Sequence, residues 1–207
     1  MNLRRDEYLV QNRQTMKIRE GIREDDRFLA ETVMEAMGEE LCIGLAGNRQ
    51  RLPLVRELFT ALAAESDSQY SYTNAFVSES DSGERLGAVI AYDGARLHEL
   101  RRAFILQANR ILGWNVTEKE AEEWGDEAAS DEIYIDSLYV VTKARKQGIA
   151  SELLNAVERR YASVGKPLGL LVEPDNKTAY VTYLHLGFRE VGISNFFRSP
   201  MIHMQKL

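Results

Sequence analysis

The segment from residue 133 to residue 187 limits the fold most narrowly, because strand patterns and helix patterns alternate along it. Its elements are a strand at 133–141, a helix at 149–162, a near-continuous apolar strand at 167–173 and a helix at 176–187. A strand, a helix and a second strand in this order normally form a parallel crossover within one sheet. Ligands of such open sheets bind at the carboxyl ends of the strands, so we expect a site there.

The other elements complete the order β-α-α-β-β-(α insert)-β-α-β-α-β-β. Strands are predicted at 16–22, 72–80, 84–94, 188–193 and 201–207, and helices at 23–41, 52–65 and 95–114. The insert at 97–131 begins with an apolar helical stripe and ends in an acidic stretch. We expect a single domain over 1–207, in which residues 1–15 are an N-terminal extension.

Composition excludes several classes of protein. A chain of 207 residues with 44% hydrophobic and 28% charged residues is typical of a globular domain. The net charge of −6 argues against binding to nucleic acid, which needs a basic face. The single cysteine, Cys42, allows no internal disulfide, and the three histidines have no metal-ligand spacing. No apolar run reaches the roughly 18–20 residues of a membrane span, and the first residues do not resemble a signal peptide, so we expect a cytoplasmic protein. Because the histidines lack metal-ligand spacing, we expect no metal.

The turn before the helix at 149–162 carries positive charge where a helix normally favours acids. Arg145 and Lys146 precede Gly148, and the helix dipole is also positive at this end. Small residues at 148 and 150 allow a ligand to approach the backbone amides closely. The turn is therefore either a phosphate site or a plain helix start with two solvated cations.

A wider comparison of motifs favours the phosphate site. The stretch "LYVVTKARKQGIASELL" resembles the acetyl-CoA motif of the GNAT N-acetyltransferase superfamily, R/Q-x-x-G-x-G/A after a strand, with Arg145, Gly148 and Ala150 at its fixed positions. The stretch "NKTAYVTYLHLGF" resembles the second signature of the superfamily, with Asn176, Ala179, Tyr183 and Gly187-Phe188. The resemblance follows the element order from Met16 to Leu207 and is sharpest over 133–192. This chain departs from the family at Thr142, where many members carry proline, and in its long insert, which leaves the substrate open.

The resemblance implies an α/β GNAT fold. Its mixed, mostly antiparallel sheet is splayed between the fourth and fifth strands, with an extra helical insert between the third and fourth. Acetyl-CoA lies in the split, where its pyrophosphate meets the amides of 147–150 and its pantetheine arm pairs with 138–140. The implied cofactor-binding residues are Leu138, Tyr139, Val140, Arg145, Lys146, Gln147, Gly148, Ile149, Ala150, Ser151, Asn176, Ala179 and Tyr183.

Two residues are candidates for catalysis. An amine that attacks a thioester must lose a proton, and Asp136, which shares a strand face with Tyr134, could accept it. Tyr183 occupies the position of the family's acid and could donate a proton to the departing thiolate, and Tyr180 is a weaker candidate. A bulged strand end near Val140 could supply the N–H for the oxyanion. The alternatives remain that Tyr183 only packs on the cofactor and that Asp136 is a carboxylate without a role at the rim of the cleft.

These residues predict an N-acetyltransferase that moves the acetyl group of acetyl-CoA to a primary amine of a small molecule or peptide. The alternative is a non-catalytic acyl-CoA-binding module that regulates a partner. We expect no nucleic-acid or membrane partner, and a homodimer is possible. The acidic stretch 118–132 and Trp124 are expected to wall the acceptor side and to favour a cationic amine, unless the stretch is only a solvated loop.

Overall fold

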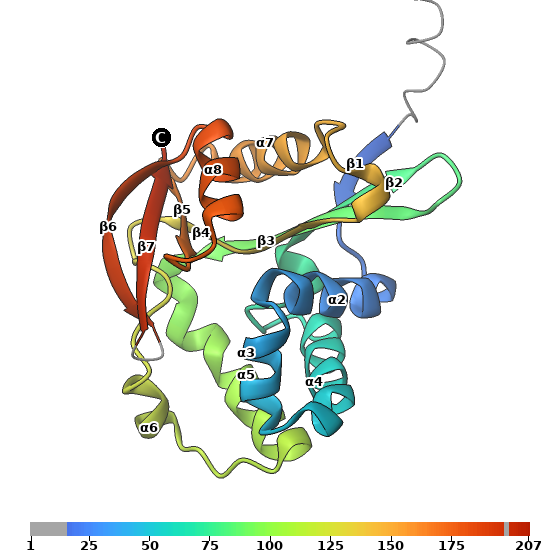
Figure 1. The fold of residues 1–207 in the computed structure, drawn as a ribbon. Coiled ribbons are helices and arrows are strands. Elements are labelled where there is room, and N and C mark those ends of the chain that lie inside the picture. Colours follow the sequence, from blue (N-terminus) through green and yellow to red (C-terminus); the bar gives the residue numbers. More distant parts are fainter. Residues whose placement is uncertain (1–15, 197–198) are drawn as a thin grey trace, which may run out of the picture.

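The computed structural model describes residues 16–196 and 199–207, so the extension expected at 1–15 lies outside the described residues. One open sheet has the strand order β1-β2-β3-β4-β5-β7-β6 (Figure 1). Its strands are β1 (Met16–Glu20), β2 (Ala75–Ser80), β3 (Arg85–Asp93), β4 (Ile133–Val140), β5 (Leu168–Val172), β6 (Arg189–Phe196) and β7 (Ser199–Lys206). The helices are α2 (Asp26–Met37), α3 (Glu39–Ala46), α4 (Leu52–Ala64), α5 (Leu97–Leu112), α6 (Glu118–Glu122), α7 (Ile149–Tyr161) and α8 (Lys177–His185).

The sheet divides between its fourth and fifth strands. Neighbouring strands pair antiparallel except β4 and β5, which are parallel and share only two residue pairs, Ile133–Leu168 and Tyr134–Gly169. Past Tyr134 the two strands diverge, while β4 remains paired with β3 along its other edge. The prediction of a mostly antiparallel sheet splayed at this point is confirmed.

Helices cover both faces of the sheet, and each face has its own apolar core. Helices α7 and α8 lie on one face, and α2, α4 and α5 lie on the other (Figure 1). On the α7 face, Ile149, Leu153 and Val157 pack against strand residues such as Val89. These three residues are spaced four apart and form the apolar helical stripe that the sequence pattern indicated. The α7 stripe therefore seats the helix so that its first turn lies at the end of β4.

The first half of the insert docks on the domain as predicted. Helix α5 buries Phe104, Ala108 and Leu112 in the core that it shares with α4, so its apolar stripe is part of the core. The rings of Phe104, Trp114 and Trp124 pack edge to face, with centroids 6.1–6.2 Å apart. Trp124 is thus a member of an aromatic cluster within the insert, where it stabilises the docking of the segment after α5.

The region predicted as one helix at 23–41 is two helices. Helix α2 ends at Met37, and Gly38 follows with a φ of 82°, a value that favours glycine and that no α-helix accommodates. The chain then continues as α3, a helix that the sequence pattern did not predict. Cys42 lies on α3 and is buried, as expected for a small apolar residue. None of the helices in 16–196 is both long enough and apolar enough to cross a membrane.

A buried carboxylate holds the closed end of the split. Glu132 is fully buried just before β4 and accepts a hydrogen bond from Gln205 Nε2 on β7 at 2.9 Å. His203 Nε2, also on β7, lies 2.7 Å from the same oxygen, and the backbone N–H of Ala129 donates to the other oxygen at 2.9 Å. The carboxylate passes over Gly169 of β5, where no side chain would fit. Glu132 thereby links the start of β4 to β7 across β5, at the point where β4 and β5 last pair. We call this arrangement the Glu132 clamp.

This packing predicts that Gly169→Ala destabilises the fold. The new Cβ would overlap the Glu132 carboxylate, and such overpacking typically costs about 1–3 kcal/mol, or about 2–12 °C in Tm for a protein of this size. Gly192→Ala on β6 is the matched control, because a Cβ there meets no atom within 4 Å. Thermal unfolding followed by circular dichroism measures both. Equal Tm values for the two variants would contradict the clamp.

Candidate active site at the split between two strands

The turn before α7 is shaped to receive an anion. Gly148 is the N-cap of α7 with a φ of 85°, and no side chain caps this end of the helix. Lys146 also has a positive φ, 62°, which is uncommon outside glycine. A Cβ at Gly148 would meet no atom within 4 Å, so a ligand can reach the first-turn amides of this 13-residue helix. Ile149 is buried beneath the turn and anchors it.

The cations of the turn lie at the end of β4. Arg145 Nε donates to the carbonyl of Val140 at 3.0 Å, which holds its guanidinium at the strand end. Lys146 and Gln147 are exposed beside Gly148. The predicted phosphate residues are therefore brought together with the last residue of β4, and the whole group is open to solvent.

The predicted pantetheine residues border the split. Leu138, Tyr139 and Val140 are half-buried and lie beyond Tyr134, where β4 has left β5. Each pairs with β3 on one edge, and none pairs with β5. Their other edge thus faces the gap and is available to an extended ligand, as in the addition of a strand.

Helix α8 borders the other side of the split. Asn176 Oδ1 caps the helix by accepting the N–H of Ala179 at 3.0 Å, so only the amide NH₂ of Asn176 is left to donate to a ligand. The ring of Tyr183 packs edge-on against Phe188, with centroids 5.6 Å apart. Burial raises the pKa of Tyr183 to about 12, so its hydroxyl keeps its proton at neutral pH. Tyr180 donates its hydroxyl to Glu190 at 3.2 Å.

Asp136 is the extra residue of a β-bulge. The register between β3 and β4 passes from Ile90–Ser137 to Ala91–Ile135, which leaves Asp136 without an opposite residue. The bulge expected near Val140 therefore lies four residues earlier, and Val140 itself pairs regularly with Gly87. The displaced backbone turns Asp136 and Ser137 toward the same side, where the Ser137 hydroxyl donates to Asp136 Oδ1 at 2.9 Å.

The surroundings of Asp136 bring the pKa of its carboxyl to about 7. Burial and, to a smaller extent, the negative charge of Glu127 together raise its pKa from 3.8 to about 7, against hydrogen bonds from Ser137 and Gln69 that lower it. Three tyrosines surround the group, and burial keeps their own pKa values well above 10: Tyr70, Tyr92 and Tyr134. At neutral pH Asp136 is therefore present in both its acidic and its basic form.

The two candidate catalytic residues lie on opposite faces of the sheet. Tyr134 beside Asp136 packs with Leu97 and Leu100 of α5. Tyr183 is half-buried and packs against the core that lies beneath α7. The open gap past Tyr134 is the place where groups from both faces can meet one ligand.

A sequence model of the Acetyltransferase (GNAT) family matches residues 56–188. The chain belongs to the GNAT acetyltransferase family. Both motifs quoted above lie within the matched segment. None of the curated proteins searched matches this chain.

Solved structures share the GNAT fold along nearly the whole chain. An N-acetyltransferase from Staphylococcus aureus Mu50 has a TM-score of 0.68 at 18% identity, covering 91% of this chain and 99% of its own. A second crystal structure, described as an acetyltransferase, has a TM-score of 0.64 at 23% identity, covering 92% and 98%. A third, described as histone acetyltransferase HPA2 and related acetyltransferase from Corynebacterium glutamicum, has a TM-score of 0.61 at 16% identity, covering 93% and 96%. At these identities the likeness establishes the fold alone.

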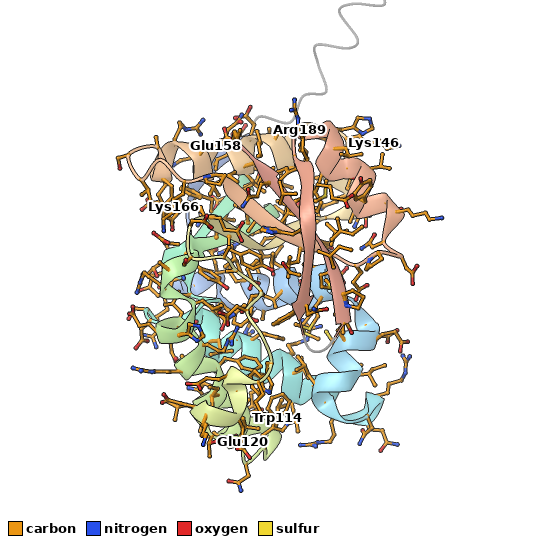
Figure 2. All side chains as sticks on the ribbon, turned by 90° about the vertical axis from the view of Figure 1, so that its left-hand side faces the viewer. Trp114, Glu120, Lys146, Glu158, Lys166 and Arg189 are labelled. Carbon is orange, nitrogen blue, oxygen red and sulfur yellow. The ribbon has the colours of Figure 1, made fainter. Side chains whose placement is uncertain are left out.

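The acidic stretch of this GNAT chain is divided between two places. Glu127 is buried, and its negative charge acts on Asp136. Other members have local partners: Asp126 lies 3.1 Å from His98, Glu118 lies 3.3 Å from Arg102, and Glu120 caps α6 through Thr117. Glu120 and Trp114 lie at the opposite end of the molecule from Lys146 (Figure 2). The stretch is thus in large part a solvated surface of the insert.

Sequence reasoning missed two residues of the site, Gln69 and Glu127. Gln69 lies in a polar loop between α4 and β2 that carries no motif, and Glu127 is one of eight acids in a run that looks solvated throughout. Its neighbours Ala128 and Ala129 were the available signal, because an acid beside small apolar residues is often buried. Within the described ranges, no group of three or more His, Cys, Asp or Glu side chains could hold a metal ion.

The raised pKa of Asp136 predicts a pH-dependent gain in stability for Asp136→Asn. The folded state binds this proton more tightly than the unfolded state, so wild-type stability falls as pH rises from about 4 to 7. The amide has no charge to bury, and the variant should gain on the order of 1–2 kcal/mol relative to wild type between pH 5 and pH 8. Thermal unfolding at both pH values measures the gain, with the exposed Asp175→Asn as control. A Tm difference that is constant with pH would contradict the shift.

Proposed function

We propose that this protein transfers the acetyl group of acetyl-CoA to a primary amine of a small molecule or peptide by direct attack. One observation carries the proposal: the gap between β4 and β5 has a carboxyl poised near pH 7 on one face and a protonated phenol on the other. Acid and base groups whose environments set their pKa values apart are typical of proton-transfer catalysis. The α7 turn at the open end of the gap supplies a site for phosphate.

The turn fits the phosphates of acetyl-CoA. The open backbone at Gly148 forms the cradle, and Arg145 and Lys146 supply the positive charge. The free edge of 138–140 provides backbone groups for the pantetheine arm, and the amide NH₂ of Asn176 can donate from the α8 side. When bound, acetyl-CoA supplies an acetyl thioester that is activated toward amines.

Asp136 acts on the amine. A lysine-like amine has a pKa of ~10.4 and is almost wholly protonated at neutral pH. A base with a pKa of about 7 is well matched to removing a proton at physiological pH. Because Asp136 lies on the α5 face, the amine reaches the gap from that side. The buried tyrosines around the carboxyl limit its contact with water.

Tyr183 acts on the departing sulfur from the α7 face. Its hydroxyl is protonated throughout the neutral range, so it donates to the thiolate as the C–S bond breaks. An amine bound beside Asp136 would lose its proton on the α5 face, and a thiolate held beside Tyr183 would gain one on the α7 face. The two proton transfers therefore do not compete for the same space.

Acetyl-CoA turnover with a panel of amines tests the proposal. The panel contains small diamines, lysine, an N-terminal peptide and neutral and anionic amines, and release of free thiol is measured. We expect turnover with at least one amine and none with the amines omitted. Binding of acetyl-CoA without turnover on any amine would instead favour a regulatory acyl-CoA-binding module.

Gly148→Glu should abolish acetyl-CoA binding while the protein stays folded. The new side chain has open space around it, but it puts a negative charge where the phosphates belong. Gly165→Glu is the matched control, because Gly165 also has a positive φ, 70°, and open space, and it follows the other end of α7. Calorimetry measures both affinities. Equal acetyl-CoA affinity in the two folded variants would remove the phosphate site.

Tyr183→Phe should lower kcat by about 10²- to 10⁴-fold, the range for loss of a general acid, with little change in acetyl-CoA affinity. The ring stays in place against Phe188, so only the proton donor is lost. Tyr180→Phe is the control, since its hydroxyl is bound to Glu190. Steady-state kinetics, under conditions where chemistry limits the rate, separate the two. An unchanged kcat for Tyr183→Phe would make the ring a packing residue.

A further inference from the structure

The insert places one buried acid against the polar cluster at the bulge. Glu127 is 5% exposed, and its carboxylate pairs with Arg101 Nη2 on α5, whose side chain is 4% exposed. Tyr92 Oη lies 3.5 Å from Glu127 Oε1. Burying an acid and an arginine costs free energy unless both are well bonded, so the pair needs a reason beyond packing.

Gln69 connects this pair to Asp136. Its side-chain amide donates from Nε2 to Glu127 Oε1 at 2.9 Å, and the same side chain lies close enough to Asp136 to lower the pKa of that carboxyl. Gln69 is itself 3% exposed, so water does not compete for these bonds. A chain of contacts thus runs from Arg101 through Glu127 and Gln69 to the bulge of β4.

We infer that Glu127 and Gln69 are positioning residues for Asp136, through which the insert sets the orientation and proton affinity of the base. The inference rests on the proposed function, in which Asp136 accepts the proton of the amine. Glu127 makes a negative charge at Asp136 less favourable, and the Gln69 amide makes it more favourable. The two residues therefore act in opposite directions on the same carboxyl.

The remaining groups around Asp136 do not supply a competing charge. The tyrosines keep their protons, because burial raises their pKa values well above the working range. Ser137 donates a neutral hydrogen bond to the carboxyl. The groups that face Asp136 are Gln69 and Tyr70 before β2, Tyr92 on β3, Tyr134 and Ser137 on β4, and Glu127 of the insert with its partner Arg101.

Two substitutions with opposite expected signs test the inference. Glu127→Gln removes the like charge, so the acidic limb of kcat/KM against pH should move to lower pH. At pH 6 about a tenth of wild-type Asp136 is ionised, given its pKa of about 7. The ratio of kcat/KM at pH 6 to kcat/KM on the high-pH plateau can therefore be up to about tenfold larger in Glu127→Gln than in wild type. Gln69→Met removes the amide donor, so the limb should move to higher pH. Glu99→Gln, an exposed acid on α5, is the control and should leave the limb in place.

A direct titration of Asp136 separates the inference from the proposed function. Carboxyl-carbon NMR of the full chain measures the midpoint of Asp136 in each variant without any acceptor. Midpoints that move in opposite directions support the inference. Unchanged midpoints in the folded variants, movement in the same direction, or a loss of activity that is uniform across pH would overturn it.

The experiment still tests the inference if one variant does not fold or if the assay detects no turnover. Glu127→Gln removes the carboxylate that pairs with Arg101 Nη2, which leaves this buried arginine with Asp126 and the carbonyl of Gly125, and the variant could fail to fold. In that case the upward shift in Gln69→Met, which leaves the Arg101–Glu127 pair intact, decides the question. If wild type acetylates no amine in the panel, the proposed function fails, and the NMR midpoints still decide whether Glu127 and Gln69 govern Asp136.

Discussion

The site depends on the limited parallel pairing between β4 and β5. β4 and β5 share two residue pairs, and the Glu132 carboxylate holds the strands there by bonding to β7 over a glycine of β5. Had the parallel pairing continued, the backbone of 138–140 would be satisfied by β5 and no edge would be left for a ligand. The clamp thus fixes where the gap begins, and the α7 turn, the β4 edge and α8 are all positioned from that point.

Much of the fold was predictable because its signals are local. Apolar periodicity located α4, α5 and α7, and the two motifs located the α7 turn and α8, where Gly148 and Gly187 have the positive φ values that glycine suits. The break at Gly38 was not predicted, because the residues before and after it both favour a helix. Whether a glycine within a helical pattern ends the helix depends on the path that the tertiary fold sets for the chain.

The candidate site was predicted in part. The residues of the turn and of α8 follow from motif positions, whereas the role of Asp136 depends on a one-residue shift of register that no pattern within β4 reveals. Glu127 and Gln69 reach Asp136 only through long-range packing, 9 and 67 residues away along the chain. Residues that reach a site from outside its motifs carry at most a weak signal in one sequence, such as the small apolar neighbours of Glu127, because their place depends on what they contact.

The aromatic cluster of the insert has a practical consequence for spectroscopy. The chain has two tryptophans, and both Trp114 and Trp124 lie in this cluster, in contact with each other and with Phe104. Intrinsic tryptophan emission therefore reports on the insert alone, while far-ultraviolet circular dichroism reports on the sheet and helices together. Any difference between the two signals along a denaturant titration is a direct reading of how tightly this segment holds to the domain, obtained without attaching a label.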